Sequence, residues 1–574
     1  MAPPFLKVEK VEKVEKVEKN KIELIIYLIK YIKYNYSNHL MSQYINSYFS
    51  DSHFVFDNKK VDNILVPLPF QEDAFFGILN LKTIPSSITT QEQEFVFVVD
   101  RSSSMSSYGS DNKSKMYHII HTLKNMIDYF YNHPEIALHI TIFVFDSGFE
   151  TLIERTTINA ENLGEIIEKI ESLIPDHFTN IENALNNVGK YISFLQSEYP
   201  SHNINHIFMT DGETTSGSKD WDVLKNLVDP SIHNAFIGYG LYHDSELLQY
   251  ISDYKNSSYH FIDAIEKSGL VYGEILHNIL YKYLTNAEIV IQNGLVYNYK
   301  TNMWNDTLYI GDITGDSSKT FHLVSTIPDD CRVLLGFSFE NEKICLNIPL
   351  VMCIEEMNLY KYIYRQRTLQ LLFNSNEKQK RKIHRSEFSF DNFKEKQKEK
   401  QKDTEIKNLL MELFTEMNML LENEENGMNH IDKNFIKNLC DDLYIAHSTY
   451  GTKFGTMYTT ARQVSQGTQR CYTASSTPDD INMDSCNLDI CNMDDDIPRF
   501  SLKLPVITRQ TTRHITDLFE DPIIQSHFDS DITDSSPLQK YKYKYNVSNY
   551  TESPYCNDTA SEVMKHISSH TDTE

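Results

Sequence analysis

The sequence predicts an α/β fold in which a doubly wound parallel sheet carries helices on both faces. Two apolar runs, Phe95–Val99 and His206–Met209, have the composition of strands buried on both faces, and each leads into an aspartate. Segments with helical apolar spacing alternate with these and other short strands across residues 92–285. This alternation is typical of parallel sheet units.

Each expected element follows from its local pattern. Apolar residues at helical spacing, such as Ile119, Leu123 and Ile127, predict helices. Continuous apolar runs bounded by polar turns predict buried strands, and Pro175 ends one of the helices. In chain order, we expect strands at 95–99, 138–145, 206–210, 234–238 and 258–262, and helices at 118–130, 162–173, 221–228, 245–254 and 269–283.

A group of oxygen-bearing side chains follows the first buried strand. Asp100, Ser102 and Ser104 come directly after it, at spacings of two and four residues. Ligands of open α/β sheets bind beyond the carboxyl ends of the strands, and hard cations such as Mg²⁺ prefer oxygen ligands. Taken alone, the motif fits a metal site and a strand end capped by a serine-rich turn equally well.

Two later segments add to this motif. Thr179 stands just before a helical pattern, where an N-cap would lie, and a second buried strand ends in Thr210-Asp211-Gly212. The order Asp-x-Ser-x-Ser, Thr, Thr-Asp-Gly resembles the von Willebrand factor A domain and its metal-ion-dependent adhesion site. The resemblance implies that Mg²⁺ or Mn²⁺ is held, directly or through water, by Asp100, Ser102, Ser104, Thr179 and Asp211.

The chain departs from the family pattern at two points. His177-Phe178 stand where many members have Gly-Gly, so we expect a stiffer or displaced loop before Thr179. The link Ser106–Ser114 is longer than usual, and its Asp111 is expected to be a solvated bystander. These departures bear on metal affinity more than on the presence of a site.

The segments outside residues 92–285 suggest further domains. Short, regularly spaced strands over 286–350 predict a small antiparallel β-sandwich, which strands from 60–91 should join. Helical apolar spacing predicts a helical region at 351–472, through which the chain could form a homo-oligomer, including as a coiled coil. We expect a low-complexity or helical extension at 1–59 and a largely disordered acidic tail at 473–574.

Composition restricts the possible partners and the cellular location of the protein. A net charge of −26 argues against nucleic-acid binding, and we expect no transmembrane segment. The eight cysteines include no Cys-x-x-Cys pair, which disfavours structural zinc and indicates reduced thiols in an intracellular, cytoplasmic setting. The abundance of Asn, Ile, Lys and Tyr suggests an AT-rich source, such as a large DNA virus or a protist.

Three functions fit these features. The first is a metal-dependent protein-binding module, not an enzyme, in which an Asp or Glu of a protein partner completes the coordination of the ion. The second is a phosphoryl-transfer enzyme with Asp100 as its nucleophile, although Ser102 stands where such enzymes usually have a second aspartate. The third is a metal-free scaffold that acts through the helical region and the tail.

Overall fold

The structure is a computed structural model, and it describes most of the chain between residues 48 and 473. Residues 1–47 of the expected extension, residues 61–73 of the strands expected at 60–91 and most of the tail fall outside the described residues. The side chains of 58–60 and 381–402 are also not described. The described residues are 48–60, 74–108, 112–212, 214–240, 243–262, 267–340, 342–351, 359–386, 393–423, 428–452, 454–473, 541 and 552–569.

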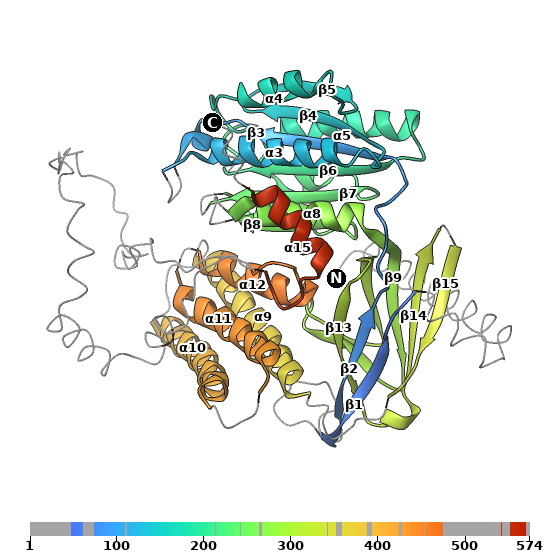
Figure 1. Ribbon diagram of the computed structural model, residues 1–574. Coiled ribbons are helices and arrows are strands. Elements are labelled where there is room, and N and C mark those ends of the chain that lie inside the picture. The colour runs from blue at the N-terminus through green and yellow to red at the C-terminus, as the bar shows by residue number, and fades with distance from the viewer. Residues whose placement is uncertain are drawn as a thin grey trace, which may run out of the picture.

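The first sheet has six strands and forms the centre of the α/β unit (Figure 1). In chain order they are β3 (Gln93–Asp100), β4 (Leu138–Phe145), β5 (Phe149–Thr156), β6 (Asn203–Thr210), β7 (His233–Tyr239) and β8 (Ser257–Ile262). Their spatial order is β5-β4-β3-β6-β7-β8, and every pair is parallel except β4 with β5. Val99 pairs with Val144 on one side and Met209 on the other, as a doubly wound sheet requires.

Helices cover both faces of this sheet because the side chains of β3 are apolar on both faces. Val96 and Val98 face one core, which α5 (Ile181–Glu198), α6 (Trp221–Lys225) and α7 (Ser245–Ile251) complete. Phe95, Phe97 and Val99 face the other, covered by α3 (Lys115–Asn132), α4 (Leu163–Glu171) and α8 (Ser268–Leu280). The predicted fold class is therefore confirmed. The edge strand β5 was missed, since most of its residues are partly or fully exposed and no continuous apolar run marks it.

Two antiparallel sheets form the expected sandwich and share one core. One has the order β1-β2-β13-β10-β11 and the other β12-β9-β14-β15. Strand β2 pairs with β13, so residues before the α/β unit complete a domain that follows it. The bounds are β1 (His53–Lys60), β2 (Phe75–Lys82), β9 (Lys282–Gln292), β10 (Leu295–Asn298), β11 (Met303–Asn305), β12 (Thr307–Thr314), β13 (Ser318–Ser325), β14 (Arg332–Phe339) and β15 (Glu342–Ile348).

Two boundaries predicted for the sandwich need correction. Strand β1 lies within residues 1–59, which were expected to be a low-complexity extension, yet it pairs with β2 and buries Phe54 and Phe56 in the sandwich core. Strand β9 begins at Lys282, two residues after α8 ends, rather than at residue 286. The α/β unit and the sandwich are therefore joined with almost no linker.

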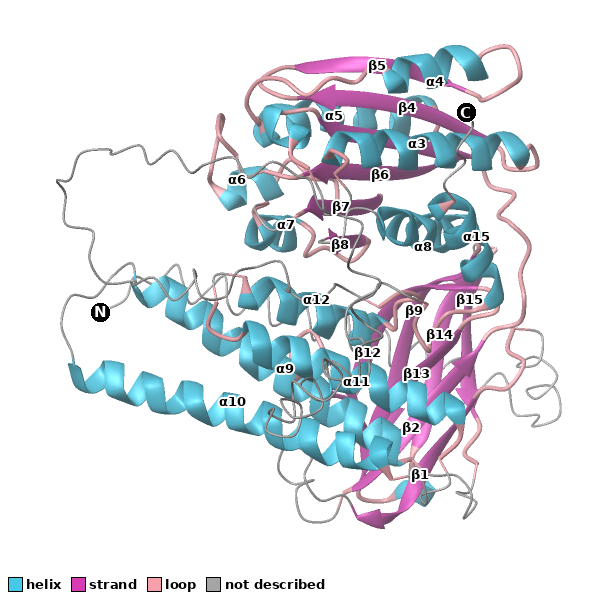
Figure 2. Cartoon of the chain, turned by 60° about the vertical axis from the view of Figure 1, so that its left-hand side comes forward, coloured by secondary structure: helices cyan, strands magenta, loops and turns pink. Residues whose placement is uncertain are grey.

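Four helices form a layer beside the sandwich and below the parallel sheet (Figure 2). They are α9 (Tyr360–Ser386), α10 (Phe393–Glu422), α11 (His430–Thr449) and α12 (Gly455–Thr468). Leu410, Leu443 and Met457 join the apolar core on the α5 side of the parallel sheet. Among the described helices, none has the length and the apolar run that crossing a bilayer requires.

The predicted disordered tail is wrong for residues 552–569. Helix α15 (Asp558–Ser568) packs against α8 and α3, as Figure 1 shows at the red end of the chain. A Cβ at Gly273 of α8 would lie only 2.5 Å from the Cα of Met564, so the missing side chain allows the two helices to touch. A bridge between Tyr472 and Glu552 ties this segment to the end of the helical layer.

Candidate metal centre

The five predicted ligands lie together at the carboxyl edge of the parallel sheet. Asp100 is the last residue of β3, and Ser104 belongs to the short 3-10 helix η1 (Ser103–Ser106) that follows it. Thr179 precedes α5 and Asp211 directly follows β6. All except Ser104 are buried, and Ser102 lies between Asp100 and η1.

Hydrogen bonds connect four of the five residues. Asp100 Oδ1 accepts from the backbone N–H of Ser102 at 2.8 Å, and Oδ2 accepts from the Thr210 hydroxyl at 2.6 Å. The hydroxyls of Ser102 and Ser104 lie 3.0 Å apart. The Ser104 hydroxyl donates to Asp211 Oδ1 at 2.6 Å, which links the loop after β3 to the loop after β6.

Thr179 faces the same place from the third loop. A Cβ at Gly212 would lie 3.3 Å from Thr179 Oγ1 and 3.7 Å from Ser104 Oγ, so both hydroxyls lie close to the backbone at residue 212. The backbone of Thr179 is held by Thr215, whose hydroxyl accepts from the Thr179 N–H at 2.9 Å. The structure thus brings all five residues together, and their binding of a metal stays a prediction.

The charges of the site favour a cation. Burial and, second to it, the negative charge of Asp211 raise the pKa of Asp100 to about 6, against the hydrogen bonds from Thr210 and Ser102. Two buried carboxylates beside three hydroxyls offer only oxygen donors. A divalent hard cation would remove the repulsion between the carboxylates, so the residues present fit Mg²⁺ or Mn²⁺.

Lys115 is a member of the site that the sequence analysis missed. Its Nζ lies 2.5 Å from Asp211 Oδ2, and the lysine side chain is only 10% exposed. Lys115 is the first residue of α3, where a cation opposes the helix dipole and gains nothing locally. A lysine in the first helical turn after the serine motif is therefore the signal that could have revealed it.

The loop before Thr179 shows how the chain accommodates His177 at a position where many family members have glycine. His177 adopts φ of 65°, the left-handed backbone conformation that glycine favours. Its carbonyl accepts from the N–H of Ser103 at 3.1 Å, which ties this loop to η1. The loop therefore keeps a glycine-like backbone despite the substitution. Asp111 lies outside the described residues.

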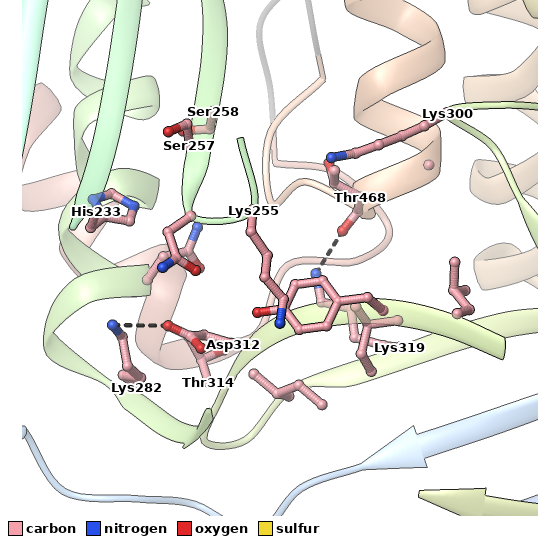
Figure 3. Close-up of a pocket in the computed structure, with 18 of the residues that line it drawn as sticks. His233, Lys255, Ser257, Ser258, Lys282, Lys300, Asp312, Thr314, Lys319 and Thr468 are labelled. Carbon is pink, nitrogen blue, oxygen red and sulfur yellow. Dashed lines mark hydrogen bonds and ion pairs between the residues drawn. The ribbon is translucent and has the colours of Figure 1, made fainter. Parts of the chain in front are cut away.

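A separate cavity of about 800 Å³ lies away from this site, between the amino ends of β6 to β8 and the sandwich (Figure 3). Lys255, Lys282 and Lys319 line this cavity, and Lys282 Nζ lies 2.9 Å from Asp312 Oδ2. The cavity contains none of the five predicted ligands. It lies at the opposite edge of the parallel sheet from Asp100.

Comparisons with known proteins found similar solved structures. Among solved structures, a von Willebrand factor type A protein from Catenulispora acidiphila matches with a TM-score of 0.39 and 14% identity, over 57% of this chain and 82% of that one. The ArnB paralog VWA2 from Sulfolobus acidocaldarius matches with a TM-score of 0.39 and 14% identity, over 72% and 98%. No curated protein matches in sequence.

A family model matches a defined part of the chain. Residues 95–213 match the family model of the von Willebrand factor type A domain. This range begins in β3 and ends just after Asp211, so it contains all five predicted ligands. Residues 95–213 are therefore similar to a von Willebrand factor type A domain.

Proposed function

We propose that this protein is a metal-dependent protein-binding module. Mg²⁺ or Mn²⁺ would be held by Asp100, Ser102, Ser104, Thr179 and Asp211, directly or through water. An Asp or Glu of the partner would replace a water and complete the octahedral shell of the ion. The observation that carries the proposal is the convergence of two buried carboxylates and three hydroxyls from three separate loops.

The surface around the site supports a protein as the partner. Phe178 is 69% exposed and Tyr108 is 76% exposed. Phe178 stands one residue before Thr179, and Tyr108 follows the 3-10 helix that carries Ser104. Exposed aromatic side chains beside a polar anchor point are typical of protein interfaces. An acidic side chain on the metal and apolar contacts at the rim would together select the partner.

The phosphoryl-transfer alternative finds less support. Both oxygens of Asp100 already accept hydrogen bonds, from the Ser102 N–H and the Thr210 hydroxyl. These hydrogen bonds lower the nucleophilicity of the Asp100 carboxylate, which counts against this alternative. An intracellular, cytoplasmic setting and self-association through α9–α12 remain parts of the proposal.

The test compares two aspartate variants of the full chain. Asp100→Ala removes a proposed ligand, whereas Asp176→Ala removes a carboxylate that is 70% exposed on the same edge of the sheet. Calorimetry with Mg²⁺ and Mn²⁺ measures binding, and affinity capture with Mg²⁺ or a chelator measures partner retention. Circular dichroism checks the fold.

We expect Asp100→Ala to lose both metal binding and metal-dependent capture, and Asp176→Ala to keep both. Thr179→Ala should weaken capture less, because water can replace one neutral hydroxyl. If wild type binds neither ion and Asp100→Ala captures partners as well as wild type, the adhesion-site proposal fails and the metal-free scaffold takes its place.

A further inference from the structure

We propose that Glu92, His139 and His202 form a second metal site, suited to Zn²⁺, at the opposite edge of the parallel sheet. Glu92 directly precedes β3, His139 is the second residue of β4, and His202 directly precedes β6. These strands are neighbours, so their amino ends meet. The eight residues of β3 separate the two edges by roughly 25 Å, so this inference does not depend on the adhesion site.

The three side chains lie close enough to share one ion. A nitrogen of each histidine and a carboxylate oxygen of Glu92 all lie within 4.8 Å of one another. Zn²⁺ bonds of about 2.1 Å would bring tetrahedral ligand atoms to about 3.4 Å. The backbone N–H of Asn203 donates to the carbonyl of Glu92 at 2.9 Å, and the exposed Glu92 side chain, which already contacts His202, can shift to close the remaining gap.

A buried carboxylate sets the orientation of His202. Glu94 is 1% exposed, and its Oε1 lies 2.7 Å from His202 Nδ1 and 2.7 Å from a guanidinium nitrogen of Arg155. With its Nδ1–H donating to Glu94, His202 directs Nε2 toward Glu92, whose carboxylate it contacts. An ion between them would take the place of the proton on Nε2. A carboxylate behind a metal-bound histidine is the usual arrangement at zinc sites, so Glu94 is a positioning residue.

His139 has an unsatisfied nitrogen beside this pair. Its Nδ1 is buried without a hydrogen-bond partner among the described residues, 3.5 Å from Glu94 Oε1. The His139 and His202 rings are nearly parallel, with centroids 6.0 Å apart. With both histidines neutral, Glu92 and Glu94 outweigh Arg155 by one negative charge, which attracts a cation.

Two histidines and one carboxylate leave a fourth position open on a tetrahedral ion. His202 also lines the cavity drawn in Figure 3, so water reaches the site from that side. The donor set contains no cysteine and therefore differs from the structural zinc sites that the cysteine pattern disfavours. Because it has nitrogen donors, this site should also prefer different metal ions from the all-oxygen site at Asp100.

Co²⁺ is a suitable probe because it takes the place of Zn²⁺ and its visible absorption is strong only in tetrahedral sites. The full chain is titrated with Co²⁺ and then with Zn²⁺, as wild type, Glu92→Gln, His139→Asn and Asp100→Ala. Glu92 is exposed, so Glu92→Gln removes a ligand charge without disturbing the core. Asp100→Ala is the matched control that removes only the other site.

We expect a strong Co²⁺ band in wild type and in Asp100→Ala that Zn²⁺ displaces. Glu92→Gln and His139→Asn should each weaken Zn²⁺ binding at least tenfold. The proposal is overturned if no such band appears, which would leave His202 as a protonated bridge between Glu92 and Glu94. It is also overturned if the band persists in both ligand variants or disappears in Asp100→Ala. Loss of the band only in Asp100→Ala would assign the ion to the adhesion site.

Discussion

The ion pair between Lys115 and Asp211 should control both the stability of the metal-free protein and its affinity for Mg²⁺. The perturbation is Lys115→Met, which keeps most of the length of the side chain and removes its charge. Asp211 is fully buried and Lys115 nearly so, with Nζ 2.5 Å from Oδ2. The variant therefore leaves a buried carboxylate without its cation, beside the Asp100 carboxylate.

The magnitude follows from the geometry. At an effective dielectric constant of about 20, two unit charges at this distance attract by about 7 kcal/mol. The desolvation of Lys115 offsets part of this attraction, and loss of one partner of a buried pair costs about 3–5 kcal/mol. We expect the free energy of unfolding without metal to fall by that amount at pH 7.

The effect on metal binding has the opposite sign. Removal of Lys115 takes the summed charge of Asp100, Asp211 and Lys115 from −1 to −2, so Mg²⁺ should bind more tightly. At a free Mg²⁺ concentration a hundredfold above the dissociation constant, binding returns about 2.7 kcal/mol of stability. The stabilisation by Mg²⁺ should therefore be larger in the variant than in wild type.

Urea unfolding with Mg²⁺ or with a chelator measures stability, and calorimetry measures the affinity. The control is Lys113→Met, two residues earlier, where Nζ donates to the Tyr117 hydroxyl at 2.9 Å and lies 4.4 Å from the centre of the Tyr117 ring near the surface. It should change stability by less than about 0.5 kcal/mol. Equal stability of Lys115→Met and wild type in chelator, or weaker Mg²⁺ binding by the variant, would refute the reasoning.

Three further predictions concern other parts of the molecule. Burial lowers the pKa of His206 to about 4. Below the ordinary pKa of 6.5 the unfolded state therefore takes up a proton that the folded state does not, and stability falls as the pH drops from 6.5 toward 4. In urea unfolding at pH 4, His206→Leu should lose about 3 kcal/mol less of this stability than wild type. Gly273→Ala places a Cβ 2.5 Å from the Cα of Met564, so limited proteolysis should release α15 while the parallel sheet stays folded. Arg462 Nη1 lies 3.1 Å from Asp442 Oδ1 with both side chains buried, so Arg462→Met should cost about 3–5 kcal/mol in urea unfolding.

Matched variants separate these effects from nonspecific damage. Gly164→Ala is the control for Gly273→Ala, because a Cβ at Gly164 has no atom within 4 Å. Equal protease resistance of α15 in both glycine variants contradicts the docking argument. A double variant, Arg462→Met with Asp442→Leu, should recover most of the loss, since it leaves no unpaired buried charge. If stability falls with pH in His206→Leu as steeply as in wild type, the prediction for His206 is contradicted.

The sequence alone determined the parallel sheet and the members of its candidate site. Strands such as Phe95–Val99 are apolar throughout, and a strand covered on both faces must be, so the pattern is visible without any partner. The carboxyl ends of parallel strands share one edge. Asp100 and Asp211 could therefore be brought together by topology, although they stand more than a hundred residues apart.

Only the tertiary structure decided which segments join across domains. Strand β1 belongs to the sandwich because it pairs with β2, and α15 is ordered because α8 lacks a side chain at Gly273 where the two helices meet. Each segment has a short apolar pattern of its own, but that pattern does not say which distant surface it covers. Lys115 and the group of Glu92, His139 and His202 are likewise recognisable only once three strands and a helix are in place. Local patterns record whether a residue is buried, but the partner of a charged side chain depends on distances that folding alone establishes.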